Sequence, residues 1–148
     1  MKFLHDAFVL ARLAKHLCAE KVRLAEPSAQ WPDGLVQLEG KIRNIEVTST
    51  HGGRKLGAEY RNHEGLSVEE DPIEVWVSRA ESIPKYLDEA IDVKRGKCYG
   101  APCWLVVYLN ISEWGIHQKQ IEAVIAEVKA RYAPSFEAIS VLWKGRFY

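Results

Sequence analysis

Two acidic residues carry the strongest chemical signal in this sequence. Asp33 follows Trp31-Pro32 at a turn, and Glu46 lies in a β-rich segment a dozen residues further on. Mg²⁺ and Mn²⁺ prefer oxygen ligands, so two carboxylates brought together can hold one such ion. A metal held in this way polarises a phosphate and lowers the pKa of an attacking water. The spacing therefore suggests a metal-dependent phosphodiesterase, although an isolated Asp and an isolated Glu are also common surface residues.

A lysine lies in line with the apolar face of the helix predicted after residue 82. Lys94 follows Ile91 by three residues and Leu87 by seven, which places it on or beside the face that packs against a sheet. Such a lysine commonly extends its ammonium to solvent over its apolar stem. The alternative is that its charge points at the acidic pair.

Hydrophobic periodicity predicts helices and strands in the order α-β-β-(β)-α-β-α-β. Helices alternate with strands after residue 80, so part of the sheet should be parallel, with right-handed crossovers. The expected class is therefore α/β, with helices on both faces of a mixed sheet. The predicted elements are a helix over 3–24, strands over 34–38 and 42–50 joined by a turn at Glu39-Gly40-Lys41, a further strand over 73–78, a helix from Ser82 to about Lys94 that Gly96 or Gly100 ends, a strand over 102–110, a helix over 117–132 and a strand over 138–143.

The composition, 47% hydrophobic and 27% charged, indicates one globular domain over residues 1–148. No apolar run approaches the roughly 18 residues of a membrane span, and charged residues interrupt the apolar N-terminus. We therefore expect a cytoplasmic protein that does not enter a membrane. The polar, glycine-containing stretch 51–72 favours a flexible functional loop.

Charge and cysteine content place few further limits on function. The formal net charge is zero, so bulk charge does not indicate nucleic-acid binding. Basic residues gather at 41–61, 94–97 and 144–146, where they could follow phosphates, although an ordinary solvated surface is the commoner explanation. The three cysteines form no CxxC motif, and we interpret them as reduced and mostly buried; they are Cys18, Cys98 and Cys103.

Pro32-Asp33, followed by Glu46-x-Thr48 in a β-β unit, resembles the motif of the PD-(D/E)XK nuclease superfamily, also called restriction-endonuclease-like. The element order α-β-β-β-α-β around it is similar to the core of that superfamily, and the resemblance extends over residues 3–143. It implies that Asp33 and Glu46 bind Mg²⁺ or Mn²⁺, with the carbonyl of Val47 as a further ligand. It also implies DNA as the substrate and a homodimer as the assembly.

The sequence departs from that motif at Thr48, where the family has a lysine. Some family members carry the lysine on the helix behind the sheet instead, and Lys94 is placed for this role, with Lys97 as the second choice. The lysine would orient the attacking water and offset charge that develops at the phosphorus. Thr48 lacks that charge but could hydrogen-bond a water. Glu20, near the end of the first predicted helix, matches an accessory acid of some members.

Other interpretations stay open. A catalytically inactive binding module of the same fold is favoured by Thr48 and by the zero net charge, and it would bind Mg²⁺ weakly without turnover. An assembly protein would show a large apolar surface and would tolerate Glu46→Ala. His51 is a candidate acid or phosphate contact, and Trp31 and Trp114 could stack on bases, although such residues more commonly have no such role.

Overall fold

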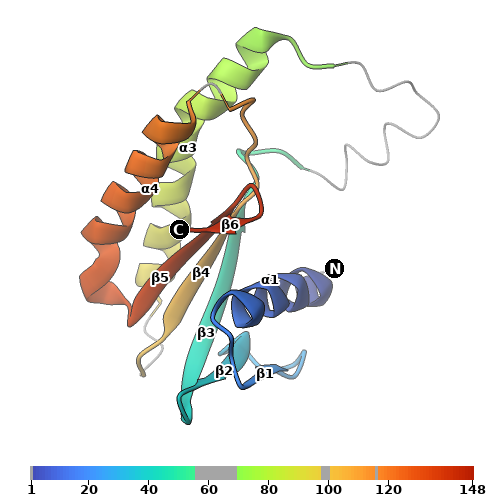
Figure 1. Ribbon diagram of the computed structural model, residues 1–148, viewed down its shortest axis with the longest axis vertical. Coiled ribbons are helices and arrows are strands. Elements are labelled where there is room, and N and C mark those ends of the chain that lie inside the picture. The colour runs from blue at the N-terminus through green and yellow to red at the C-terminus, as the bar shows by residue number, and fades with distance from the viewer. Residues whose placement is uncertain (1, 56–69, 98–100, 116) are drawn as a thin grey trace, which may run out of the picture.

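The computed structural model describes residues 2–55, 70–97, 101–115 and 117–148, and these form an α/β fold around a mixed six-stranded sheet (Figure 1). The strands follow one another across the sheet in chain order, β1-β2-β3-β4-β5-β6. β1, β2 and β3 are antiparallel, β3, β4 and β5 are parallel, and β6 is antiparallel to β5. The elements are α1 (Lys2–His16), β1 (Lys21–Leu24), β2 (Gly34–Leu38), β3 (Lys41–Thr50), α3 (Ile73–Arg95), β4 (Trp104–Leu109), α4 (Gln118–Tyr132), a 3-10 turn (Ala133–Ser135), β5 (Ala138–Trp143) and β6 (Arg146–Phe147).

Helices cover both faces of the sheet and divide the hydrophobic core into two clusters. α1 packs on one face, where its Val9, Leu10 and Leu13 meet apolar side chains of β2, β3 and β4. α3 and α4 pack together on the other face. Both parallel crossovers therefore place their helix on the same face, as right-handed connections between successive neighbouring strands do. β4 lies at the centre with most of its residues buried, so the strand predicted over 102–110 is confirmed and is covered by helices on both faces.

The turn between β2 and β3 sets the register that positions the candidate acids. Glu39 and Gly40 have φ values of 50° and 73°, so this two-residue turn needs the left-handed backbone that glycine adopts freely. From the turn, the pairing runs back to Gly34 opposite Ile45. The predicted turn and strands are thereby confirmed to within one residue.

The first helix is shorter than predicted. α1 ends at His16, Cys18 takes a left-handed φ of 50°, and Lys21–Leu24 pair with β2 as the strand β1. The prediction of a helix over 3–24 was wrong because pairing with β2 overrides the helical periodicity of these last residues. Cys18 is exposed, contrary to the expected burial, whereas Cys103 is buried; Cys98 lies outside the described residues.

The predicted strand over 73–78 is instead the beginning of α3. Its six alternating residues are too few to distinguish a strand from one face of a helix. Ser82, predicted to cap the helix, lies inside it and donates its hydroxyl to the carbonyl of Arg79 at 2.7 Å. Gly96 caps the C-terminus, as predicted. Most of the loop predicted over 51–72 lies outside the described residues. Among the helices of the described ranges, none combines the length and the apolar character needed to cross a membrane.

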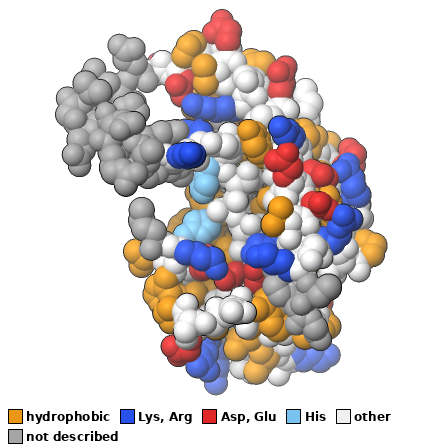
Figure 2. All heavy atoms as spheres, turned by 180° about the vertical axis from the view of Figure 1, so that it is seen from behind, with side chains coloured by type: hydrophobic (Ala, Val, Ile, Leu, Met, Phe, Trp, Pro, Cys, Tyr) orange, Lys and Arg blue, Asp and Glu red, His pale blue; other side chains and the backbone are white. Residues whose placement is uncertain are grey.

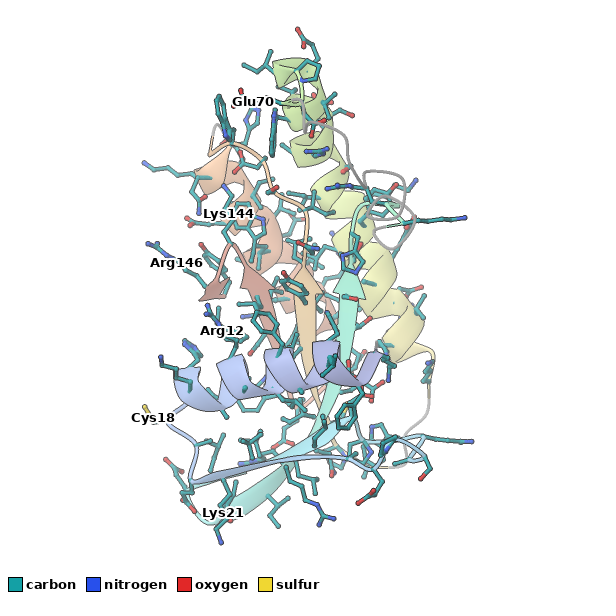
Figure 3. All side chains as sticks on the ribbon, turned by 90° about the vertical axis from the view of Figure 1, so that its right-hand side faces the viewer. Arg12, Cys18, Lys21, Glu70, Lys144 and Arg146 are labelled. Atoms are coloured by element: carbon teal, nitrogen blue, oxygen red, sulfur yellow. The ribbon has the colours of Figure 1, made fainter. Side chains whose placement is uncertain are left out.

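α1 crosses the sheet, and its two ends meet different parts of the molecule (Figure 3). Toward its C-terminal end, Arg12 donates to the carbonyl of Gly145 at 2.5 Å, beside Lys144 and Arg146. At its N-terminal end, Lys2 contacts Asp33. The basic group at 144–146 therefore lies away from the acidic pair and does not contribute to a site there.

Candidate functional site

Asp33 lies where β2 begins and its pairing with β3 stops. The last pair in that ladder is Gly34 with Ile45. Beyond that pair, Oδ2 of Asp33 accepts the backbone N–H of Val47 at 2.8 Å. The side chain of Asp33 thereby accepts the hydrogen bond that a neighbouring strand would otherwise accept. This hydrogen bond holds the carboxylate of Asp33 within one peptide unit of Glu46.

The N-terminal turn of α1 places a lysine and a second acid beside Asp33. The Nζ of Lys2 lies 2.7 Å from Oδ1 of Asp33 and 3.4 Å from Oδ2 of Asp6. The hydrogen bond to Asp33 is the main cause that raises the pKa of Lys2 above its ordinary value. The side chains of both acids are only 9% exposed. The cluster therefore sets two carboxylates against one ammonium.

Glu46 forms a buried ion pair with Lys94. Ile45 and Val47 pack against α1, so Glu46, between them on the strand, faces α3. Its Oε1 accepts a hydrogen bond from the Nζ of Lys94, and the two side chains are 4% and 11% exposed. Lys94 thus points at the predicted acid and does not extend its ammonium into solvent.

Asp33 and Glu46 belong to neighbouring positions along one edge of β3. β4 pairs with β3 on the other side as far as Thr50. On the side of Asp33, no strand among the described residues pairs with β3 beyond Ile45. The N–H and C=O groups of one strand residue point to the same side, so the carbonyl of Val47 is directed to this edge together with Asp33. Asp33 and the carbonyl of Val47 therefore share one edge of β3, and Glu46 lies one residue away with its side chain on the α3 face.

This donor set fits Mg²⁺ or Mn²⁺. Mg²⁺ is commonly bound by one or two carboxylates and completes its shell with waters and substrate phosphates. Among the described residues, no group of three or more His, Cys, Asp and Glu side chains is arranged to hold a metal ion, and a two-carboxylate site needs no such group. Lys2 and Lys94 each occupy one oxygen of the pair, so a bound cation would compete with both.

The remaining predicted residues differ in their relation to this edge. Thr48 is half-buried and follows Glu46 on the same face of β3. Lys97 is exposed just beyond α3, where it lines a pocket of about 600 Å³ together with Lys94. Glu20 is exposed and its Oε1 accepts the N–H of Gly40 at 2.9 Å, at the end of β2 opposite to Asp33. The structure does not bring Glu20 to the acidic pair, because α1 ends before it is reached.

Sequence reasoning missed Lys2 and Asp6. The two residues are one helical turn apart on α1, a spacing that identifies an ordinary surface ion pair as readily as a site. Only the packing of α1 beside the start of β2 reveals their place, where they line a pocket of about 110 Å³ with Asp33.

Cys103 reports on the charge of this site. Burial, and then the nearby carboxylate of Glu46, raise the pKa of its thiol from 9.0 to about 11, while Lys94 opposes the shift. Glu46→Gln removes the negative charge and leaves the opposing ammonium, so it is expected to lower the pKa of Cys103. Thiolate absorbance measured against pH, with Cys18 and Cys98 both replaced by Ser, tests this. A pKa unchanged by Glu46→Gln would contradict the proximity of the two side chains.

Neither a family model, a curated protein nor a solved structure matches this chain. What the site can do therefore follows from its residues: two carboxylates at neighbouring positions beside β3, each paired with an ammonium. On the face drawn in Figure 2, acidic side chains lie between basic ones, below histidine side chains. Such a surface can hold a cation and a phosphate next to one another.

Proposed function

We propose that this protein is a metal-dependent nuclease of the PD-(D/E)XK type, which hydrolyses phosphodiester bonds in DNA. The observation that carries the proposal is the buried ion pair of Glu46 and Lys94. A second carboxylate lies one peptide unit away, because Asp33 accepts the backbone N–H of Val47, the residue after Glu46. A buried ion pair contributes little to stability compared with apolar packing, because desolvating two charges is costly. Its occurrence beside a second carboxylate therefore favours a functional role.

The order of the elements supports the same proposal. α1 is followed by the antiparallel strands β1, β2 and β3, then by α3, and then by β4 parallel to β3. This is the order α-β-β-β-α-β that the motif resemblance implies. The three strands between the helices are β1, β2 and β3, so β1 completes the series in place of the strand expected over 73–78.

Each side chain has a distinct task in the proposed reaction. A Mg²⁺ or Mn²⁺ ion held by Asp33, Glu46 and the carbonyl of Val47 would polarise the phosphate and lower the pKa of water. Lys94 brings a positive charge to the place where negative charge develops on the phosphate oxygens. It thereby supplies what Thr48 cannot. Lys97, which lines the same pocket as Lys94, attracts the DNA backbone.

Cleavage of single- and double-stranded DNA tests the proposal. The wild type is expected to cleave in Mg²⁺ or Mn²⁺ and not in EDTA. Glu46→Gln is expected to lower the rate by roughly 100-fold or more, because it removes a charged metal ligand while keeping a polar side chain of the same size. Glu127→Gln, on the exposed face of α4, is the matched control and should retain full activity. Equal cleavage by wild type and Glu46→Gln would refute the site.

A catalytically inactive binding module is the second candidate. Lys2 and Lys94 already balance the charges of the two carboxylates, so the folded protein needs no metal to balance them. Thr48 also replaces the motif lysine. This alternative predicts DNA binding without cleavage in any metal. The homodimer implied by the resemblance is a separate expectation, which sedimentation of the purified chain would test.

A further inference from the structure

A second polar pocket lies at the carboxyl ends of the parallel strands β3 and β4. Its volume is about 250 Å³, and its polar lining comes from His51, Arg54, Arg79, Ser82, Asn110 and Ser112. Ligands of α/β proteins commonly bind outside the carboxyl ends of the strands. Ser82 and Lys94 are twelve positions apart on α3, which is roughly 18 Å along a helix, so the pocket is distinct from the acidic pair.

The backbone brings the two arginines of this pocket together. β3 and β4 end side by side, and the N–H of Asn110 extends their pairing by donating to the carbonyl of Thr50 at 2.9 Å. Gly52 and Gly53, with φ values of 64° and 78°, then turn the chain, and the N–H of Arg54 donates back to the carbonyl of His51 at 3.3 Å. The turn places Arg54 at the pocket that Arg79 reaches from α3.

The charges of the lining residues favour an anion. Arg54 and Arg79 are both cationic, and within the part of the chain that the structure describes none of the lining residues is an Asp or a Glu. Asp71, which does not line the pocket, pairs with Arg79 at 2.7 Å and is exposed. Guanidinium groups present planar pairs of N–H donors that match phosphate oxygens. A volume equal to about eight waters accommodates a phosphate group but is small for a whole ligand.

A hydrogen-bonded chain prepares His51 as a further donor. The hydroxyl of Tyr108 donates to Oδ1 of Asn110 at 3.5 Å, and Nδ2 of Asn110 donates to Nδ1 of His51 at 2.9 Å. The proton of a neutral His51 therefore resides on Nε2. Burial, with His5 and Arg54 nearby, lowers the pKa of His51 below 6.5, so the neutral form prevails at pH 7.

An aromatic surface adjoins the pocket through Arg79. The guanidinium of Arg79 lies 4.8 Å from the ring centre of Trp76. Trp76 stacks with Trp114 at 6.3 Å between centroids and an interplanar angle of 17°. Trp114 is 72% exposed, which is unusual for so large an apolar side chain. A phosphate pocket next to an exposed indole is the combination that proteins use to hold single-stranded nucleic acid.

We propose that this pocket binds a backbone phosphate of a single-stranded nucleic acid and that a neighbouring base stacks on Trp114. Arg54 and Arg79 hold the phosphate, and Nε2 of His51 donates to it. A single strand is favoured over a duplex because only an unpaired base can leave its neighbours and stack on a side chain. The identity of the ligand as nucleic acid rests on the proposed nuclease function, and the pocket would hold the strand at a distance from the acidic pair.

Fluorescence anisotropy of a labelled single-stranded DNA in EDTA, where no metal supports cleavage, tests this proposal. The slope of log affinity against log salt is expected to fall in magnitude by about 0.7 in Arg79→Gln and in Arg54→Gln, since each loses one phosphate contact. Trp114→Ala is expected to weaken binding roughly fivefold or more with an unchanged slope. Arg131→Gln, an exposed arginine paired with Asp88 on the other side of α3, is the matched control. Affinities and slopes of the two pocket variants equal to those of the control would overturn the proposal.

Two further comparisons separate this proposal from the nuclease function. If the wild type cleaves DNA but the pocket variants bind like the control, the pocket proposal fails and the nuclease stands. If binding depends on both arginines but no metal supports cleavage, the nuclease fails and the pocket stands. The last comparison measures the melting temperature in inorganic phosphate and in chloride at equal ionic strength. Phosphate that raises the melting temperature of the wild type and not of Arg79→Gln, without any binding of DNA, would overturn the proposal in favour of a small phosphoester.

Discussion

Replacing Lys94 with Met is expected to lower the free energy of unfolding by about 3–5 kcal/mol. The substitution keeps the apolar stem but removes the ammonium, so it leaves the carboxylate of Glu46, in a side chain only 4% exposed, without the lysine of α3. Urea denaturation of the wild type and the variant measures the difference. Lys94→Met is also expected to abolish cleavage, because it removes the ammonium that would offset negative charge developing on the phosphate oxygens.

A double substitution distinguishes the loss of charge balance from a loss of packing. Glu46→Gln combined with Lys94→Met removes both charges and is expected to recover most of the lost stability but none of the activity. Lys144→Met is the matched control, since Lys144 pairs with the buried Glu113. It should cost less, because Glu113 also accepts the N–H groups of Gly115 and His117 at 3.0 Å each. A double variant no more stable than Lys94→Met would contradict the electrostatic explanation.

Asp33→Ala and Asp33→Asn are expected to differ in stability but not in metal binding. Alanine leaves the N–H of Val47 without its acceptor, which costs about 1–3 kcal/mol, and it also removes the partner of Lys2. Asparagine retains an acceptor oxygen for Val47 and should keep most of the stability. Both variants lose a charged metal ligand, so calorimetric titration with Mn²⁺ is expected to show at least a roughly tenfold weaker affinity, a loss of about 1.4 kcal/mol.

The Asn variant is the decisive member of this pair. If Asp33→Asn binds Mn²⁺ as tightly as the wild type, the carboxylate serves only to cap the edge of β3 and is not a ligand. A loss of metal binding only in Asp33→Ala would have the same meaning, because that variant also disturbs the strand.

The sequence predicts the part of the site that depends on local pattern. Alternation of apolar residues and the turn at Glu39-Gly40 give β2, β3 and their register, and the register brings Asp33 next to Glu46. Helical spacing from Leu87 and Ile91 places Lys94 on the sheet-facing side of α3, where it meets Glu46. These predictions succeed because the period of each element fixes which side chains share a face.

The rest depends on contacts between distant segments. Nothing local marks Lys2 as the partner of Asp33, because the two meet only when α1 packs beside the start of β2. β1 escaped prediction for a similar reason, since its pairing with β2 overrides a helical pattern. The pocket with Arg54 and Arg79 requires that a turn after β3 and the middle of α3 come together. The periodicity of a single helix or strand carries no information about contacts between segments that are distant in the sequence.

Broadening of amide signals by Mn²⁺ in ¹⁵N-labelled protein is the measurement that tests the central claim most directly. If Asp33 and Glu46 hold a metal at the open edge of β3, the signals of Gly34 and Val47 should broaden first in the wild type. They should remain sharp in Glu46→Gln at the same Mn²⁺ concentration, while signals near Gly52 stay sharp in both proteins. Equal broadening of Gly34 and Val47 in the wild type and in Glu46→Gln, or broadening that begins elsewhere, would contradict the metal site.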